Sequence, residues 1–342
     1  MRQALTVLLA VVALLWLPGP SHAQNVGEVF KRVAPSVVVI RARGRDVSAG
    51  GGLTSFNETG SGVLISADGK VMTAAHVVHA MDEISVEFLG GETVGARVVA
   101  SEPAADLSLL QLAKVPPTAR AAKLADSSAV QVGDQVIIVG APFGLSYSLS
   151  VGWISARWAP NTVYRSMPLA EFFQTDAVIN TGNSGGPMFN MQGEVIGLVS
   201  HNISKSGGSE GLGFVVTANT AKELLLEQRS FWSGLEGELL TDEVADILNL
   251  PPQARGYIVK TVAKGSPADT MGIKGGTSTA TIAGHHIVVG GDILLNVEGI
   301  PVGTATAFTQ IRQRMSSLSA GSPFKVTVLR KGQVLELTGK VP

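Results

Sequence analysis

The sequence predicts a mainly β protein of two domains. Its 342 residues suggest about two domains at roughly 150 residues each. From Val37 to about Val216, short runs of β-branched residues alternate with turn residues, a pattern typical of an all-β barrel or sandwich. Forty glycines fit many tight turns. Apolar residues make up 45% of the chain and charged residues only 15%, so a buried core can form and disorder of the whole chain is excluded.

The first 23 residues have the pattern of a secretory signal peptide. Arg2 precedes an apolar run over residues 4–17, and the small residues Ser21 and Ala23 precede the expected cut before Gln24. An uncleaved membrane anchor is the alternative, although the run is short for a membrane-spanning helix. The chain has no cysteine, so no disulfide or thiolate metal site contributes to its stability. We therefore expect an exported protein of the bacterial periplasm.

The first domain is expected at residues 24–230, followed by a linker at 231–237. Its expected strands include residues 37–40, 62–66, 135–140 and 195–200, and a helix at 218–229 closes it. A polar segment at 44–59 is interpreted as a mobile surface loop.

The second domain is expected at residues 238–342 and is of mixed α+β type. It opens with a short helix at 241–248, capped by Thr241. Its other expected elements are strands at 257–262, 292–297, 325–329 and 334–338, and a helix at about 305–317.

A glycine-rich turn presents a candidate nucleophile, Ser184. Residues 181–187 read TGNSGGP, and glycines beside a serine let backbone N–H groups converge where an oxyanion would form. The pattern also matches the nucleophile elbow of α/β-hydrolase esterases. That elbow needs a helix directly after the serine, whereas Pro187 and an expected strand follow here. A loop serine without a chemical role is the remaining alternative.

Two further positions supply the groups that a nucleophilic serine needs. His76, in a turn of small residues at 73–78, is a base with a pKa near neutrality. Asp106 immediately precedes an apolar strand, where a half-buried carboxylate could hold the imidazole in the required tautomer. Asp126, in a polar turn, is an alternative partner. The order His, Asp, Ser within a β-rich domain is that of the chymotrypsin type.

These motifs belong to a series that resembles the HtrA/Deg family of periplasmic serine proteases with one PDZ domain. The series comprises VAPSVV at 33–38, GSGV at 60–63, AAHV at 74–77, ADL at 105–107, FQTDAVINTGNSGGP at 173–187 and GGSEGLGF at 207–214. The resemblance implies a chymotrypsin-like double β-barrel followed by a C-terminal PDZ domain. It implies a serine endopeptidase that cleaves unfolded or misfolded proteins through an acyl-enzyme.

The resemblance also implies a role for each site residue. Ser184 would be the nucleophile, His76 the general base and Asp106 its orienting group. The oxyanion hole would be formed by the loop of Gly182, Asn183 and Ser184.

The expected substrate pocket is apolar. Val178 stands six residues before Ser184, where trypsin-like enzymes carry the Asp that selects basic residues, so we expect a preference for small aliphatic side chains. The segment from Leu198 through Ser200 to His201 resembles the substrate-pairing strand of the family and is expected to wall this pocket.

The PDZ resemblance rests on RGYI at 255–258, KGSPA at 264–268 and GDI at 291–293. PDZ domains add a peptide as an extra strand and hold its terminal carboxylate with backbone N–H groups. Arg255, Gly256, Tyr257 and Ile258 are the candidate residues for that loop. An insertion at 277–284 is longer than in many family members.

Charge and histidine spacing restrict other partners. Twenty-six basic against 27 acidic residues give no strong field for nucleic acid or anionic lipid. The pairs His76/His79 and His285/His286 lack a carboxylate or thiolate to complete a tetrahedral set, so we expect no metal and no cofactor. By resemblance, a segment near Phe30 would build a homotrimer or a larger oligomer. A chaperone or peptide-binding scaffold without proteolysis is the alternative function.

Overall fold

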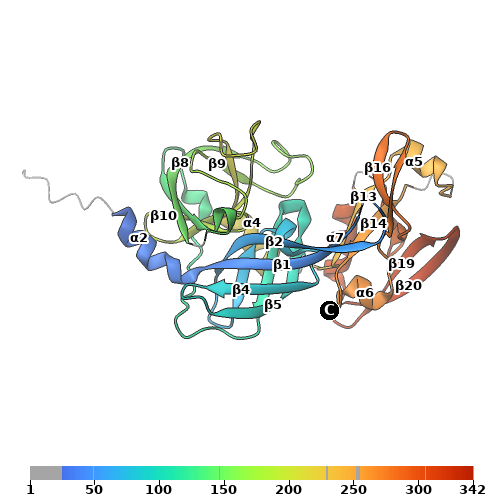
Figure 1. Ribbon diagram of the computed structural model, residues 1–342, viewed down its shortest axis with the longest axis horizontal. Coiled ribbons are helices and arrows are strands. Elements are labelled where there is room, and N and C mark those ends of the chain that lie inside the picture. Colours follow the sequence, from blue (N-terminus) through green and yellow to red (C-terminus); the bar gives the residue numbers. More distant parts are fainter. Residues whose placement is uncertain are drawn as a thin grey trace, which may run out of the picture.

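A computed structural model describes residues 25–48, 50–145, 147–228, 230–251, 255–304 and 306–341 of the chain. The signal peptide expected at 1–23 lies outside these residues. Two closed β-barrels are followed by a mixed domain built on an antiparallel sheet, so the predicted fold class is confirmed (Figure 1). Within the ranges given, no helix is long and apolar enough to cross a membrane.

The first barrel closes in the strand order β1-β2-β3-β6-β5-β4. Its strands are β1 Val37–Val47, β2 Leu53–Leu64, β3 Lys70–Thr73, β4 Glu83–Phe88, β5 Thr93–Glu102 and β6 Leu107–Leu112. Alternate side chains of each strand point to one face, so β-branched and leucine residues such as Val38, Ile40 and Leu110 fill the interior.

The second barrel closes in the order β10-β11-β12-β9-β8-β7. Its strands are β7 Gln135–Gly140, β8 Ser148–Trp158, β9 Phe172–Thr175, β10 Pro187–Asn190, β11 Val195–Asn202 and β12 Gly213–Thr217. A core cluster that includes Leu107, Ile137 and Phe189 contains residues from both barrels. The two barrels are therefore held against each other, and the loops between their strands meet at this junction.

Short helices connect and cover the barrels. They are α2 Val26–Val33, η1 Ala34–Ser36, α3 Ala75–Val78, η2 Pro103–Ala105, η3 Ser127–Ala129, η4 Pro142–Gly144 and α4 Ala218–Lys222, which continues as the π-turn η5 Glu223–Glu227. The helix α2 begins at the N-cap Asn25, whose side chain accepts from the N–H of Gly27. Phe30 on α2 packs against the cluster between the barrels.

The C-terminal domain contains a sheet in the order β13-β14-β17-β19-β20, with β18 beside β17, and a separate β15-β16 hairpin. Its strands are β13 Leu235–Leu239, β14 Tyr257–Val262, β15 Ser278–Ile282, β16 His285–Val289, β17 Ile293–Val297, β18 Ile300–Pro301, β19 Pro323–Arg330 and β20 Gln333–Lys340. Its helices are α5 Asp242–Ile247, α6 Pro267–Met271 and α7 Ala307–Ser317. The linker expected at 231–237 overlaps β13, so its last three residues belong to this sheet.

The segment at 44–59 is a hairpin and not the loop expected from its polar sequence. Pairing of β1 with β2 continues from Val37↔Val63 to Val47↔Leu53. In Figure 1 this hairpin runs from the first barrel to the C-terminal domain, where β1 contacts β14. The N–H of Gly52 donates to the Thr277 carbonyl at 3.0 Å. The polar side chains of the hairpin are exposed because its two strands extend beyond the barrel.

Candidate active site

Asp106 lies at the end of the turn η2 and is almost fully buried, at 7% exposure. Its backbone is left-handed, with φ of 55°, and this conformation ends the turn just before β6. Its Oδ1 accepts from the backbone N–H of His76 at 3.1 Å and lies 2.9 Å from the Nδ1 of His76. Its Oδ2 lies 3.0 Å from the same Nδ1. The carboxylate therefore fixes both the backbone and the ring of His76.

His76 lies on the single-turn helix α3, directly after β3, and its side chain is 47% exposed. Burial would lower the pKa of His76, but the hydrogen bond and charge of Asp106 outweigh this and raise it above 6.5. Burial would raise the pKa of Asp106, but its bonds to His76 and Ser200 lower it below 3.8. Asp106 is thus ionised at neutral pH.

Asp126, the alternative partner, is occupied elsewhere. It is the N-cap of η3 and accepts from the hydroxyl of Ser128 at 2.6 Å, from the side-chain amide of Asn219 at 2.8 Å and from the N–H of Ser128 at 2.9 Å. These bonds lower its pKa to about 2. The structure does not bring Asp126 into contact with His76.

Ser184 lies in a turn that only glycine-flanked sequences can form. Gly182 has φ of +100°, and a Cβ there would lie 2.2 Å from the Ala141 carbonyl oxygen. Gly185 has φ of +79°, and a Cβ there would lie 2.1 Å from the hydroxyl oxygen of Thr73. The glycine spacing found in the sequence thus has a steric cause.

Two backbone donors of this turn are unpaired. Among the described residues, the N–H groups of Gly182 and Ser184 have no hydrogen-bond partner. The N–H of Asn183 instead donates to the Asn180 carbonyl at 3.0 Å. Of the three residues expected in the oxyanion hole, only Gly182 and Ser184 therefore have a free N–H donor among the described residues, because the Asn183 N–H is already used inside the loop.

Ser61, on β2, holds this loop from the first barrel. It is fully buried, its hydroxyl donates to the Gly182 carbonyl at 2.7 Å, and its N–H donates to the Ser184 carbonyl at 2.8 Å. The hydroxyl also accepts from the N–H of Ala141 at 2.9 Å. Sequence reasoning gave Ser61 no role, although the GSGV motif that contains it was the available signal.

Ser200 joins the nucleophile to the carboxylate. Its carbonyl accepts from the Ser184 hydroxyl at 3.4 Å, and its own hydroxyl donates to Oδ2 of Asp106. No hydrogen bond joins the described side chains of Ser184 and His76, and catalytic hydrogen bonds are often long in unliganded sites. Ser200 was expected to wall the substrate pocket, but its hydroxyl points to the triad.

The other residues expected in the pocket are not brought together. Val178 is 51% exposed, whereas Leu198 is 1% exposed and packs in the cluster between the barrels. His201 packs among aromatic rings, with its ring 4.0 Å from that of Tyr164 between centroids. The expectation that Leu198 walls a pocket with Val178 is wrong for the side chains, because Leu198 is on the face of β11 that packs between the barrels.

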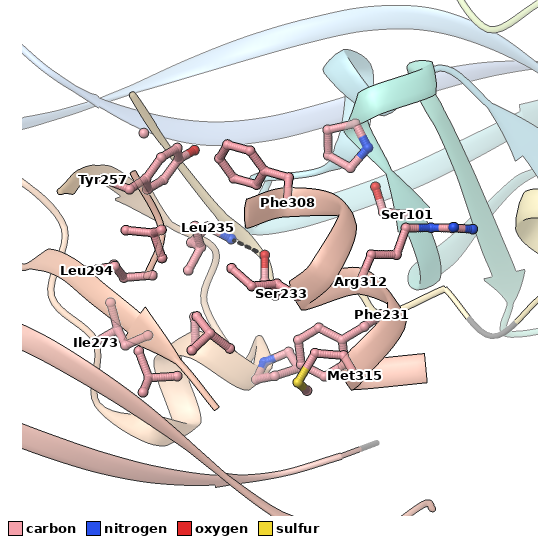
Figure 2. Close-up of a pocket in the computed structure, with 18 of the residues that line it drawn as sticks. Ser101, Phe231, Ser233, Leu235, Tyr257, Ile273, Leu294, Phe308, Arg312 and Met315 are labelled. Atoms are coloured by element: carbon pink, nitrogen blue, oxygen red, sulfur yellow. Dashed lines mark hydrogen bonds between the residues drawn. The ribbon is translucent and has the colours of Figure 1, made fainter. Parts of the chain in front are cut away.

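The C-terminal domain contains a cavity of about 450 Å³ between β13 and α7. Figure 2 shows Leu235 from β13 opposite Phe308, Arg312 and Met315 from α7. The wall toward the first domain is formed by residues 101–104, which lead directly into Asp106. β13 is the first strand of its sheet, so one of its edges has no partner strand among the described elements.

The assignment of Arg255–Ile258 as the peptide loop is corrected by this topology. Tyr257 and Ile258 begin β14, which pairs with β13 on one side and with β17 on the other. A strand paired on both sides cannot accept a peptide as an additional strand. Arg255 forms an exposed ion pair with Asp242 at 3.0 Å.

The comparisons with protein families and curated proteins agree with this architecture. The family of trypsin-like peptidase domains matches residues 60–198, and the PDZ domain family matches residues 212–341. The periplasmic pH-dependent serine endoprotease DegQ of Escherichia coli is 32% identical over 289 residues, 82% of this chain and 59% of DegQ. The periplasmic serine endoprotease DegP of Salmonella typhimurium is 33% identical over 293 residues, 84% of this chain and 57% of DegP. The chain thus spans less than three fifths of these relatives.

Similar solved structures cover nearly the whole chain. The HtrA-type protease AlgW with a decapeptide has a TM-score of 0.53 and 27% identity, and covers 92% of this chain and 97% of that one. The same protease with a tripeptide has a TM-score of 0.52 and 29% identity, with coverage of 94% and 97%. The chain therefore contains a trypsin-like peptidase domain followed by a PDZ domain, and over nearly its whole length it is similar to HtrA-type serine proteases.

Proposed function

We propose that this protein is a serine endopeptidase in which Ser184, His76 and Asp106 form the catalytic triad. The observation that carries the proposal is the contact of His76 with a buried, ionised Asp106, beside a serine turn with two unpaired N–H groups. Such a set supplies a base, its orienting group and an oxyanion hole.

In the proposed reaction, Ser184 Oγ attacks a peptide carbonyl and Nε2 of His76 takes the hydroxyl proton. Asp106 holds the Nδ1–H of His76 and stabilises the imidazolium that forms. The N–H groups of Gly182 and Ser184 bind the oxyanion. His76 then gives its proton to the leaving amine, and water, deprotonated by the same ring, hydrolyses the acyl-enzyme.

The proposed substrate is an extended segment of an unfolded protein. β10 pairs with β11 from Phe189↔Val195 to Pro187↔Leu198, so no described strand pairs with residues 200–202 on that edge of β11. An extended substrate chain can add to such an edge beside Ser184. A folded protein cannot supply such an extended segment. The apolar Val178 supports the preference for small aliphatic side chains, although it does not share a pocket with Leu198.

We propose that the cavity between β13 and α7 binds C-terminal peptides. Its lining is mainly apolar, with Leu235, Tyr257 and Phe308 among its residues, and the free edge of β13 can pair with a peptide strand. The solved AlgW structures contain a decapeptide or a tripeptide, which supports a peptide ligand for this chain. Because residues 101–104 form one wall and precede Asp106, peptide binding would affect the active site.

The remaining proposals concern location and assembly. The named relatives DegQ and DegP are periplasmic, which supports export of this chain by its N-terminal segment. We also propose the homotrimer implied by family resemblance, with α2 at its interface. Analytical ultracentrifugation at several concentrations tests it, and a monomer throughout would reject it.

The function is tested by a cleavage time course on a disulfide-free unfolded protein, comparing the wild type with Ser184→Ala. We expect cleavage by the wild type only, with cuts after small aliphatic residues identified by mass spectrometry. Each reaction is run with and without a hydrophobic C-terminal peptide, so that a resting enzyme is detected. No cleavage under either condition would favour the chaperone, and equal cleavage by both proteins would reject Ser184 as the nucleophile.

A further inference from the structure

The side chain of His201 faces the cluster between the two barrels, where its ring neighbours Tyr164, Phe172 and Phe214 lie. Its ring stacks on Phe214, with centroids 5.7 Å apart and an angle of 17° between the planes. Tyr164 and Phe172 meet it edge-on at 4.0 and 5.7 Å. Three aromatic rings therefore fix the plane of the imidazole, and only one of its nitrogens has a polar partner among the described residues.

That nitrogen is connected to the proposed triad through one hydroxyl. Nδ1 of His201 lies 2.8 Å from Ser200 Oγ, and the same hydroxyl donates to Oδ2 of Asp106. A serine hydroxyl has one proton, and an ionised carboxylate can only accept. Because the Ser200 proton is used on Asp106, Ser200 Oγ must accept from His201. His201 is therefore the tautomer with its proton on Nδ1.

The other ring nitrogen supports this tautomer. Nε2 of His201 is buried and has no hydrogen-bond partner among the described residues. An unprotonated nitrogen is the less costly form there, because a protonated one would be a buried donor without an acceptor. Burial also lowers the pKa of His201 to about 4, so the ring is neutral at neutral pH.

We propose that His201 is a positioning residue for the triad, which holds the Ser200 hydroxyl as a donor to Asp106. The inference rests on the proposed function of the triad. In the opposite tautomer, Nδ1 would accept and would compete with Asp106 for the one proton of Ser200. His201 therefore determines which group accepts the hydrogen bond from the Ser200 hydroxyl. It acts on His76 only through Ser200 and Asp106.

The effect on His76 has a defined sign. The titratable groups that face His201 are Asp106 and His76, both through Ser200, and Tyr164, whose hydroxyl is buried without a partner. A donor to Ser200 strengthens the bond from Ser200 to Asp106. Without this donor, the negative charge of Asp106 is less compensated by the Ser200 hydroxyl. Asp106 then stabilises the imidazolium of His76 more strongly, which raises the pKa of His76.

Two substitutions separate the hydrogen bond from the packing. His201→Phe keeps an aromatic ring against Phe214 but removes the donor, whereas His201→Asn removes the ring but places an amide N–H near the position of Nδ1. We expect His201→Phe to lower kcat by about 3- to 10-fold at little change in KM, and to move the acid limb of kcat/KM to higher pH. We expect His201→Asn to restore most of kcat and the wild-type limb.

Thermal unfolding of both variants controls for folding. If Asn is the damaging substitution and Phe is harmless, His201 acts by packing and the proposal is rejected. The proposal is also rejected if both variants have the same pH profile of kcat/KM as the wild type.

A second measurement does not depend on proteolysis. Nitrogen-15 NMR of labelled histidine in the full chain reports the tautomer of His201 and the pKa of His76. We expect an Nδ1–H signal for His201, and a raised pKa of His76 in His201→Phe. A proton on Nε2 of His201 would overturn the inference even if the enzyme is active. If the expected NMR signals are found but the protein cleaves no substrate, only the proposed function is rejected.

Discussion

Replacement of Asp106 by asparagine tests the orienting carboxylate with almost no change in shape. Oδ1 accepts from the backbone N–H of His76 at 3.1 Å, so an asparagine must keep its oxygen there. Its NH₂ group then takes the place of Oδ2, which lies 3.0 Å from Nδ1 of His76. A donor at that position favours the tautomer with the proton on Nε2, which cannot take the proton of Ser184.

The magnitude follows from the loss of both tautomer and charge. The substitution also leaves the imidazolium without an opposite charge in a site where Asp106 is 7% exposed. Similar triads lose about 10⁴-fold in kcat, which corresponds to about 5.4 kcal/mol of transition-state stabilisation. Loss of the hydrogen bond from Ser200 alone would cost less, because a hydrogen bond to a charged group contributes about 1.5 to 3 kcal/mol.

The assay is the initial rate of cleavage of an unfolded protein at saturating substrate and neutral pH. The matched control is Asp126→Asn, which changes an exposed carboxylate that caps η3 and should leave kcat unchanged. A kcat for Asp106→Asn within tenfold of the wild type, or an equal loss in Asp126→Asn, would refute the reasoning.

Three other predictions concern pH, stability and regulation. Activity requires neutral His76, and the pKa of His76 is raised above 6.5 by Asp106. As pH decreases, kcat/KM should therefore fall with a midpoint above pH 6.5. A midpoint below that value in a pH–rate profile would contradict the Asp106 contact. Asp292 is fully buried and pairs with Arg330 at 2.6 Å, so Asp292→Ala should lower the free energy of unfolding by about 3 kcal/mol in urea titrations. An unchanged midpoint of urea unfolding would exclude a structural role for this ion pair. Removal of residues 236–342 should leave a folded protease domain by circular dichroism but abolish activation by hydrophobic C-terminal peptides, and unchanged activation would place their site elsewhere.

Sequence patterns were sufficient for the fold class because the barrel strands are short runs rich in β-branched residues and separated by turn residues. They were also sufficient to select candidates for the active site, since the glycines around Ser184 are required by their own backbone conformation. The role of Ser61 could not be found in this way. Its hydroxyl contacts Gly182 at a separation of 121 residues, and only the packing of the two barrels creates that contact.

The PDZ peptide loop was misassigned for a related reason. Arg255–Ile258 has the composition of a glycine loop leading into a strand, but whether a strand lies at an edge is a property of the whole sheet. Leu235–Gly237 was included in the expected linker, and its glycine and glutamate are indeed poor strand formers. Pairing with β14 outweighs that preference.

The central claim is that Ser184 is a nucleophile activated by His76, and covalent labelling tests it most directly. The wild type and His76→Ala would be treated with a fluorophosphonate, and the modified residue located by peptide mass spectrometry. The account predicts a single adduct on Ser184 in the wild type and a much slower reaction in His76→Ala. Labelling at another residue, or equal rates in the two proteins, would contradict it.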